Sequence, residues 1–354
     1  MTGHGGNIYR FSEEYGIPER RIIDFSSSIN PLGISKAISR ELQGSLKCLY
    51  GYPDIDAMKL KRRLSELHDI VPESLICGNG STELIYLVVR ALRPEKGLIP
   101  APTFSEYEKA VIISHPRVAK SHVKYFRLDK KNNFEISPGG YVQALKGCDM
   151  AFLCNPNNPT GRLLKKDEVI KIADSAKALK CYLIVDEAFI DFCPGESVIK
   201  EVTKNPYLIV LRSLTKFYAL AGLRLGYIVF PLNLVKLIED YKEPWTVNTL
   251  AQRAGIVAVN DISFRNETFR TIKKEKKFLE EGFEKLRIDY IPSAANYYLI
   301  RTKKATDIIA SLKNKGILVR DCSNFYGLDN SYIRIAVKSR RHNALLLKEL
   351  KGVI

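Results

Sequence analysis

Short apolar runs alternate with amphipathic stretches along the middle of the chain, between residues 74 and 230. Each run is too short for a helix and is followed by small or polar residues, so it predicts a buried strand. The amphipathic stretches at 84–92 and 165–179 predict helices between these strands. Alternation of this kind predicts an α/β fold, in which a mainly parallel sheet has helices on both faces. The predicted strands cover residues 74–77, 97–102, 150–154, 181–185 and 207–211.

The two ends of the chain have a different pattern. The N-terminal part contains one short strand-like run at 22–26, and a helix is predicted to start near Asp54. Helical patterns cover most of residues 249–286, and strand-like runs follow at 296–300 and 332–337, which predicts a smaller α+β domain. We therefore expect an N-terminal arm (1–35) that joins the small domain, a large domain (36–244) and a small C-terminal domain (245–354).

The composition is that of a globular protein with a positive charge. Of the 354 residues 45% are hydrophobic and 27% charged, and the formal net charge is +16. The basic residues are dispersed, and clusters such as 273–277 mix with acids, as on solvated helix faces. We therefore prefer attraction of anionic small molecules to binding of nucleic acid. A basic nucleic-acid-binding module remains the alternative, and it would show salt-sensitive DNA binding.

The cysteine content argues for a reducing compartment. The seven cysteines are odd in number, form no C-x-x-C pair and lie partly in apolar runs, which is typical of buried free thiols and not of a zinc site. The N-terminus lacks an apolar signal core, and no apolar stretch is long enough to span a membrane. We therefore expect a cytoplasmic protein without a metal site or membrane segment.

Candidate ligand-binding residues follow the predicted strands at their carboxyl ends, where parallel sheets bind ligands. They are Gly80, Ser81, Thr82, Phe104, Asn158, Asp186, Ser213 and Lys216. A lysine at this edge can form a Schiff base with a carbonyl cofactor, and desolvation would lower its pKa. Most lysines at strand ends are solvated, so the coincidence of these residues at one edge is the stronger argument.

Three further features point to anionic ligands. The glycine-rich turn before the helix at 84–92 could bind a phosphate through backbone N–H groups, although an ordinary helix cap is the alternative. Arg224 follows Lys216 by eight positions and could return to the same pocket. Arg320 and Arg334 lie in strand-like runs of the small domain, where each could bind a carboxylate or phosphate or form a salt bridge.

Four motifs in order resemble those of pyridoxal-phosphate enzymes with the aspartate aminotransferase fold. They read Asn-Pro-Asn-Asn-Pro-Thr-Gly (155–161), Val-Asp-Glu-Ala (185–188), Ser-Leu-Thr-Lys (213–216) and Gly-Leu-Arg-Leu-Gly (222–226). Within this fold the chain resembles the histidinol-phosphate aminotransferase branch, and most of all the threonine-phosphate decarboxylases of cobalamin biosynthesis. That second resemblance extends over nearly the whole chain, through residues 4–7, 24–26, 29–33, 52–54, 186–192, 244–248 and 326–329.

The resemblance implies a role for each matching residue. Lys216 would bind pyridoxal 5'-phosphate covalently, Asp186 would pair with its pyridine nitrogen, Asn158 would hydrogen-bond its phenolic oxygen, and Phe104 would stack on its ring. The cofactor phosphate would be bound by Gly80, Ser81, Thr82, Ser213 and Arg224, with Tyr52 from the second subunit of a homodimer. The substrate would be bound by Arg320 and Arg334, assisted by His4, Asn30 and Asn158.

Two positions depart from the patterns of these families. Aminotransferases of this branch usually have tyrosine at the position of Phe189, and phenylalanine there matches the decarboxylases. The decarboxylases tend to have asparagine at the position of Ser28. The resemblance implies decarboxylation of L-threonine O-3-phosphate. A histidinol-phosphate aminotransferase and a decarboxylase of L-serine O-phosphate remain the alternatives.

Overall fold

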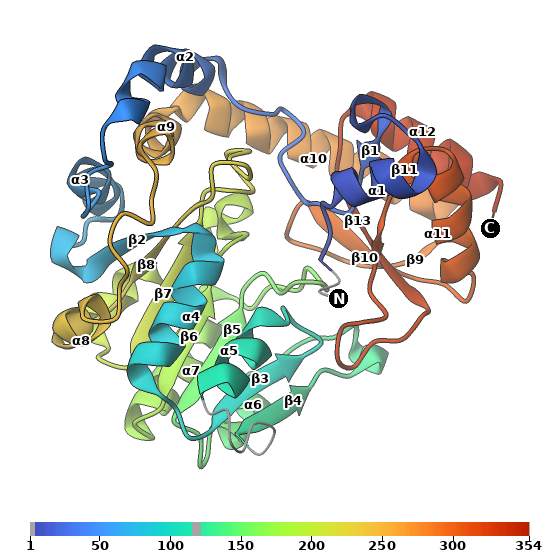
Figure 1. Ribbon diagram of the computed structural model, residues 1–354. Coiled ribbons are helices and arrows are strands. Elements are labelled where there is room, and N and C mark those ends of the chain that lie inside the picture. The colour runs from blue at the N-terminus through green and yellow to red at the C-terminus, as the bar shows by residue number, and fades with distance from the viewer. Residues whose placement is uncertain (1–3, 115–121, 354) are drawn as a thin grey trace.

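A seven-stranded sheet forms the centre of the computed structural model, which describes residues 4–114 and 122–353 (Figure 1). Its strand order is β2-β8-β7-β6-β5-β3-β4. Strand β8 is antiparallel to both of its neighbours, whereas the other neighbouring pairs are parallel. The strands are β2 (Leu75–Asn79), β3 (Gly97–Ala101), β4 (Val123–Arg127), β5 (Met150–Cys154), β6 (Tyr182–Asp186), β7 (Leu208–Ser213) and β8 (Leu225–Val229). The predicted mainly parallel α/β sheet is confirmed.

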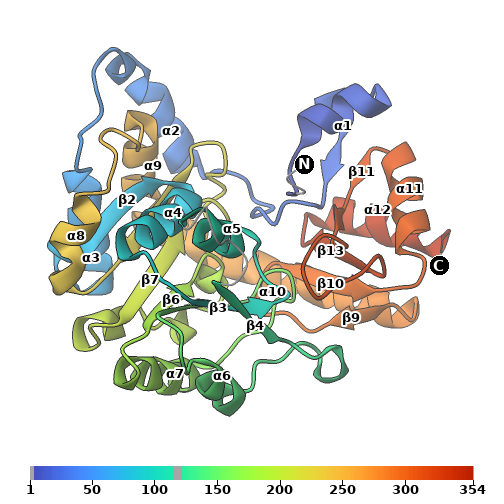
Figure 2. The ribbon, with the colours of Figure 1, turned by 60° about the horizontal axis from the view of Figure 1, so that its bottom comes forward.

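Helices cover both faces of this sheet, as Figure 2 shows. One face packs against α4 (Gly80–Leu92), α5 (Glu106–Ser114) and α8 (Val235–Glu239). The other packs against α3 (Met58–His68), α6 (Pro138–Ala144), α7 (Lys166–Ala178) and α9 (Thr249–Asn260). Successive residues of β6 enter opposite cores, with Leu183 and Val185 on one side and Ile184 on the other. Burial on both faces explains the continuous apolar runs of the sequence.

Helix α4 begins at Gly80, four residues before its apolar stretch. Gly80, Ser81 and Thr82 form its first turn, where the Ser-Thr pair was expected. Their backbone N–H groups are therefore among those that a helix leaves without internal partners.

A second, four-stranded antiparallel sheet lies in the C-terminal part, with the order β12-β13-β10-β9. Its strands are β9 (Asp289–Ile291), β10 (Tyr297–Arg301), β12 (Arg320–Asp321) and β13 (Tyr332–Ala336). The helices α10 (Ile262–Lys285), α11 (Ala305–Asn314) and α12 (Arg340–Lys351) pack against it. None of the helices in the described parts of the chain is long and apolar enough to cross a membrane.

The N-terminal segment lies against this C-terminal part (Figure 1). After α1 (Ile8–Tyr15), strand β1 (Ile23–Asp24) pairs in parallel with β11 (Ile317–Leu318). The backbone of Phe25 continues the contact, because its N–H donates to Leu318 and its oxygen accepts from Ala336. The chain then crosses to α2 (Lys36–Ser45), which packs on α9 beside the large sheet. Residues 4–30 therefore lie where they can contact both sheets.

Candidate active site

A cavity of about 490 Å³ lies between the carboxyl ends of the large sheet and the strands β12 and β13. The structure brings most of the predicted site residues to its walls. They are His4, Ser81, Thr82, Phe104, Asn158, Asp186, Ser213, Lys216, Arg224, Arg320 and Arg334. Phe189 and Ser28, the two positions that depart from the family patterns, also line it.

Lys216 follows β7 in a turn that its neighbours hold by hydrogen bonds. The hydroxyls of Ser213 and Thr215 lie 2.7 Å apart, and the N–H of Asn30 donates to the backbone oxygen of Lys216 at 3.0 Å. Burial, with the nearby Arg334 and Arg224, lowers the pKa of Lys216 from 10.5 to about 8. A larger fraction of its amine is therefore uncharged near neutral pH and able to act as a nucleophile.

Asp186 ends β6 and is only 3% exposed. The Tyr107 hydroxyl donates to its Oδ2 at 2.6 Å, and the N–H of Ala188 donates to its Oδ1 at 2.9 Å. Burial raises the pKa of Asp186, although these two hydrogen bonds and Lys216 oppose the rise. A cationic N–H group bound beside it would stabilise the charged carboxylate. The pyridinium nitrogen of pyridoxal phosphate is such a group.

Tyr107 was not singled out in the sequence. It lies in the first turn of α5, three positions after Phe104, with its ring stacked on Phe152 and in edge contact with Phe104. It packs among aromatic rings as a core residue does, and no sequence signal marked its hydrogen bond to Asp186.

The first turn of α4 has the geometry of a phosphate site. Gly80 has a φ of +78°, and a Cβ atom there would lie 2.4 Å from Nη2 of Arg224. A Cβ atom at Gly226 would lie 2.5 Å from the backbone nitrogen of Ser81. Both positions therefore require glycine. The helix N-terminus, the hydroxyls of Ser81, Thr82 and Ser213 and the guanidinium of Arg224 together form the kind of donor set that binds a phosphate monoester.

Arg320 and Arg334 are directly opposite each other on β12 and β13. They are 9% and 7% exposed, and neither forms an ion pair with a carboxylate of the described residues. Arg334 donates to Asn158 and to the Ser26 backbone oxygen, and Arg320 donates to Asn324 at 2.8 Å. Buried cations of this kind are costly unless an anion compensates them. Of the two alternatives from the sequence, an anionic ligand therefore explains this arginine pair better than a structural salt bridge does.

The structure corrects the prediction that Asn30 contacts the substrate. Its side-chain nitrogen donates to the Phe217 backbone oxygen and the Thr268 hydroxyl, and its side-chain oxygen accepts from the N–H of Leu32. These internal hydrogen bonds occupy the amide. Asn30 is buried and instead supports the turn that contains Lys216.

Tyr52 lies outside this cavity. Its side chain is 86% exposed, and its ring is 5.2 Å from that of Trp245. The predicted contact of Tyr52 with the active site of a second subunit cannot form within one chain and stays a prediction.

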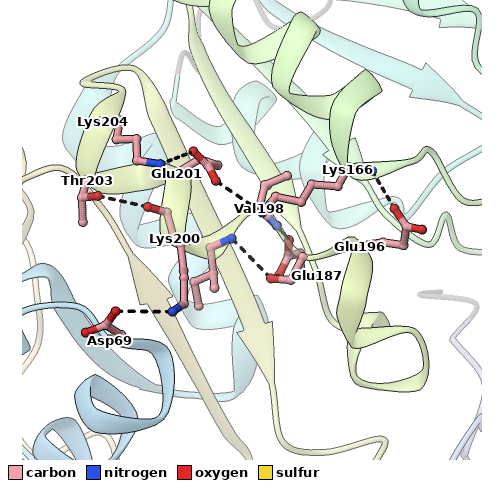
Figure 3. A network of polar contacts seen from close by, with 11 residues as sticks. Asp69, Lys166, Glu187, Glu196, Val198, Lys200, Glu201, Thr203 and Lys204 are labelled. Atoms are coloured by element: carbon pink, nitrogen blue, oxygen red, sulfur yellow. Dashed lines mark hydrogen bonds and ion pairs between the residues drawn. The ribbon is translucent and has the colours of Figure 1, made fainter.

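A buried polar network supports the end of β6, where Asp186 lies, and the segment after it, which contains Phe189. The Glu187 carboxylate accepts hydrogen bonds from Arg212 at 3.1 Å, Ser197 at 2.6 Å and the Val198 N–H at 2.7 Å. Figure 3 shows Glu187 and Val198 beside more exposed contacts, such as the ion pair of Lys200 with Asp69. No local sequence pattern indicated this network, because the partners of Glu187 lie 10 to 25 positions from it.

Comparisons with known proteins agree with this geometry. The family model for aminotransferases of class I and II matches residues 20–350. A threonine-phosphate decarboxylase from Salmonella typhimurium is 36% identical, over 100% of this chain and 97% of the relative.

Two solved structures are also similar. The histidinol-phosphate aminotransferase from Clostridium acetobutylicum has a TM-score of 0.85 and 33% identity, over 94% of this chain and 99% of that one. The L-threonine-O-3-phosphate decarboxylase from Porphyromonas gingivalis has a TM-score of 0.79 and 27% identity, over 92% and 100%. Because the family model and these relatives cover nearly the whole chain, the protein belongs to the aminotransferase class I and II family of pyridoxal-phosphate-dependent enzymes.

Proposed function

We propose that this enzyme decarboxylates L-threonine O-3-phosphate to (R)-1-amino-2-propanol O-2-phosphate and carbon dioxide, for the aminopropanol arm of cobalamin. The likeness to threonine-phosphate decarboxylases supports this reading. The observation that carries it is Phe189, which is buried at the cavity wall in edge contact with Tyr297. It presents a ring without a hydroxyl where aminotransferases of the related branch usually have tyrosine.

Pyridoxal phosphate, when bound, supplies a conjugated ring that accepts the electron pair of the bond broken at the substrate's Cα. In our proposal Lys216 would bind the cofactor covalently, and Lys216 or a water would return a proton to the substrate's Cα once carbon dioxide has left. Asp186 holds a proton on the ring nitrogen, and Asn158 and Phe104 orient the ring. The α4 N-terminus, Ser213 and Arg224 bind the cofactor phosphate.

The orientation of the substrate selects the bond that breaks, because only a bond perpendicular to the ring can pass its electrons to it. An aminotransferase holds the carboxylate in the ring plane with an arginine and leaves the Cα–H bond perpendicular. We propose that Arg320, Arg334 and His4 bind the substrate phosphate here, so that the carboxylate is perpendicular instead. Fixing one torsion is an orientation effect, which can contribute several kcal/mol.

The main alternative keeps the fold and changes the reaction. A histidinol-phosphate aminotransferase would use the same lysine and transfer the amino group to 2-oxoglutarate, and the 33% identity to such a structure favours it. L-Serine O-phosphate differs from the proposed substrate by one methyl group, and a pocket discriminates such a pair by about 1–3 kcal/mol.

We also propose a homodimer in which Tyr52 reaches the neighbouring active site. Leu49 and Tyr50 are exposed close to it in the sequence, and Trp245 is exposed in ring contact with it, so that a second subunit could cover these apolar side chains. The arm at 1–35 and the domains at 36–244 and 245–354 remain part of this proposal.

A substrate panel tests the function. Purified protein with added pyridoxal phosphate is given phosphothreonine, phosphoserine or histidinol phosphate, with and without 2-oxoglutarate, and carbon dioxide and keto acid are measured. We expect carbon dioxide from phosphothreonine without any amino acceptor. Keto acid that forms only with an acceptor, without carbon dioxide, would refute the decarboxylase proposal and support the aminotransferase.

A further inference from the structure

The buried carboxylate of Glu106, in the cavity wall, contacts the side chains of both Lys109 and His4. Glu106, the first residue of α5, is 7% exposed. Its Oε2 accepts from the Tyr86 hydroxyl at 2.7 Å, and its Oε1 lies 2.9 Å from Lys109 Nζ and 2.8 Å from His4 Nε2. Burial acts to raise the pKa of Glu106, but the hydrogen bonds from Tyr86, Lys109 and His4 outweigh it and lower that pKa. His4 and Lys109 are therefore neighbours around one oxygen atom.

Lys109 faces the same cavity as the proposed substrate residues. Lys109 of α5 lines this cavity, as do His4 from the N-terminal segment and Phe104 from the loop before α5. Arg320 and Arg334 come from β12 and β13. An ammonium group has three hydrogen-bond donors. Glu106 accepts one of them, so that two remain for a ligand in the cavity. An ordinary ion pair three residues apart on a helix surface has both partners in solvent, whereas here the carboxylate is buried.

A phosphorylated substrate could accept hydrogen bonds from the two remaining donors of Lys109. A phosphate monoester carries a charge of about −1.5 to −2 at pH 7 and has three acceptor oxygens. Arg334 already donates to Asn158 and Ser26, and Arg320 already donates to Asn324. Lys109 would add a full positive charge and two donors beside His4, on the wall that the arginines do not form.

We propose that Lys109, held in the cavity wall by its ion pair with Glu106, is a ligand of the substrate's phosphate group and helps the enzyme to select phosphorylated substrates. This inference rests on the proposed function for the identity of the substrate, but it requires only that the substrate carry a phosphate.

Three variants test the role of Lys109. Lys109→Met removes the charge and keeps an unbranched side chain, Lys109→Arg retains the charge, and Lys177→Met removes a charge from an exposed position on α7 as a control. For each holoenzyme we would measure kcat and KM for phosphothreonine and the inhibition constant of inorganic phosphate as a competitor. The absorbance of the bound cofactor reports whether the cofactor site is intact.

We expect Lys109→Met to raise KM and the inhibition constant of phosphate by about tenfold, with kcat within about threefold of the wild type and the cofactor spectrum unchanged. Lys109→Arg should stay within about threefold of the wild type for all constants, and Lys177→Met should not differ from it. A rise of less than about threefold in Lys109→Met, or an equal rise in Lys177→Met, would overturn the assignment.

The same constants separate a failure of this inference from a failure of the proposed function. If the wild type releases no carbon dioxide from phosphothreonine and transaminates histidinol phosphate instead, the proposed function fails. Lys109 is then judged by the KM for histidinol phosphate and by inhibition with inorganic phosphate, under the same thresholds.

Discussion

The guanidinium of Arg334 donates a hydrogen bond to the side-chain oxygen of Asn158. Arg334 belongs to β13 of the four-stranded sheet, and Asn158 belongs to the loop after β5 of the seven-stranded sheet. One contact thus joins the two sheets at the cavity, between a proposed substrate ligand and a proposed cofactor ligand. Removing Arg334 should therefore affect the substrate directly and Asn158 indirectly.

We predict that Arg334→Ala raises the KM for phosphothreonine by about tenfold to a hundredfold, because a charged hydrogen-bonding partner of the substrate is lost. Arg334→Lys should recover only part of this loss, since an ammonium cannot replace the two-pronged geometry of a guanidinium. Steady-state kinetics measure both effects.

Arg301→Ala is the matched control. Arg301 lies on the adjacent strand β10 and forms an exposed ion pair with Asp289, away from the cavity. The KM of Arg301→Ala for phosphothreonine should equal that of the wild type. An unchanged KM in Arg334→Ala would remove Arg334 from the substrate site.

Five of the seven strands of the large sheet, and the edge at which ligand-binding residues gather, could be predicted from the sequence, whereas β4 and the antiparallel β8 were not predicted. The apolar runs were bounded by small and polar residues, and parallel strands place their carboxyl ends at one edge, so Asp186 and Lys216 could be expected together. Arg334 was also found, because an arginine within an apolar strand is unusual. These inferences needed only local patterns and one topological rule.

The contacts that depend on distant packing could not be predicted. Asn30 lies in a motif that implied a substrate contact, but its amide is occupied by Phe217 and Thr268, which are remote in sequence. Glu106 and His4 are 102 positions apart, and no periodicity indicates that one will contact the other. Which distant side chains become hydrogen-bond partners depends on how the two sheets and the N-terminal segment pack together.

The lowered pKa of Lys216 predicts a dependence of stability on pH. The unfolded chain binds a proton at this lysine up to about pH 10.5, whereas the folded protein releases it above about pH 8. Because the unfolded state binds more protons between these values, the contribution of Lys216 to stability rises with pH through this window. The charged lysine thus costs up to about 3 kcal/mol below pH 8, and this cost disappears near pH 10.5.

We expect Lys216→Met to increase the unfolding free energy of the cofactor-free protein at pH 7 relative to the wild type, and the difference to shrink toward pH 10. Urea unfolding at several pH values measures it. Lys177→Met, at an exposed position, should show a difference that does not vary with pH. A difference for Lys216→Met that stays constant from pH 7 to pH 10 would contradict the lowered pKa.

The close approach of Gly226 to Ser81 predicts a loss of cofactor affinity on substitution. In Gly226→Ala the new methyl group would lie 2.5 Å from the Ser81 nitrogen and 3.0 Å from the Arg212 backbone oxygen, so the first turn of α4 must move. We expect the dissociation constant of pyridoxal phosphate to rise by about tenfold or more, since the turn supplies donors to its phosphate. Gly139→Ala, whose Cβ would meet no atom within 4 Å, should leave it unchanged. Equal cofactor affinity in both variants would show that the turn does not bind the cofactor phosphate.

The network behind Asp186 predicts that Arg212 stabilises the fold. Arg212 is buried and pairs with both Glu187 and Asp191, so Arg212→Met would leave two carboxylates in the protein without their cationic partner. Breaking a buried pair in this way costs about 3–5 kcal/mol. Lys200→Met removes the exposed ion pair of Lys200 with Asp69, which Figure 3 draws near Glu187. This change should lower the free energy of unfolding by less than about 1 kcal/mol. Urea unfolding of the cofactor-free variants measures both losses. If the two variants lose equal stability, the buried network does not hold the segment that contains Asp186 and Phe189.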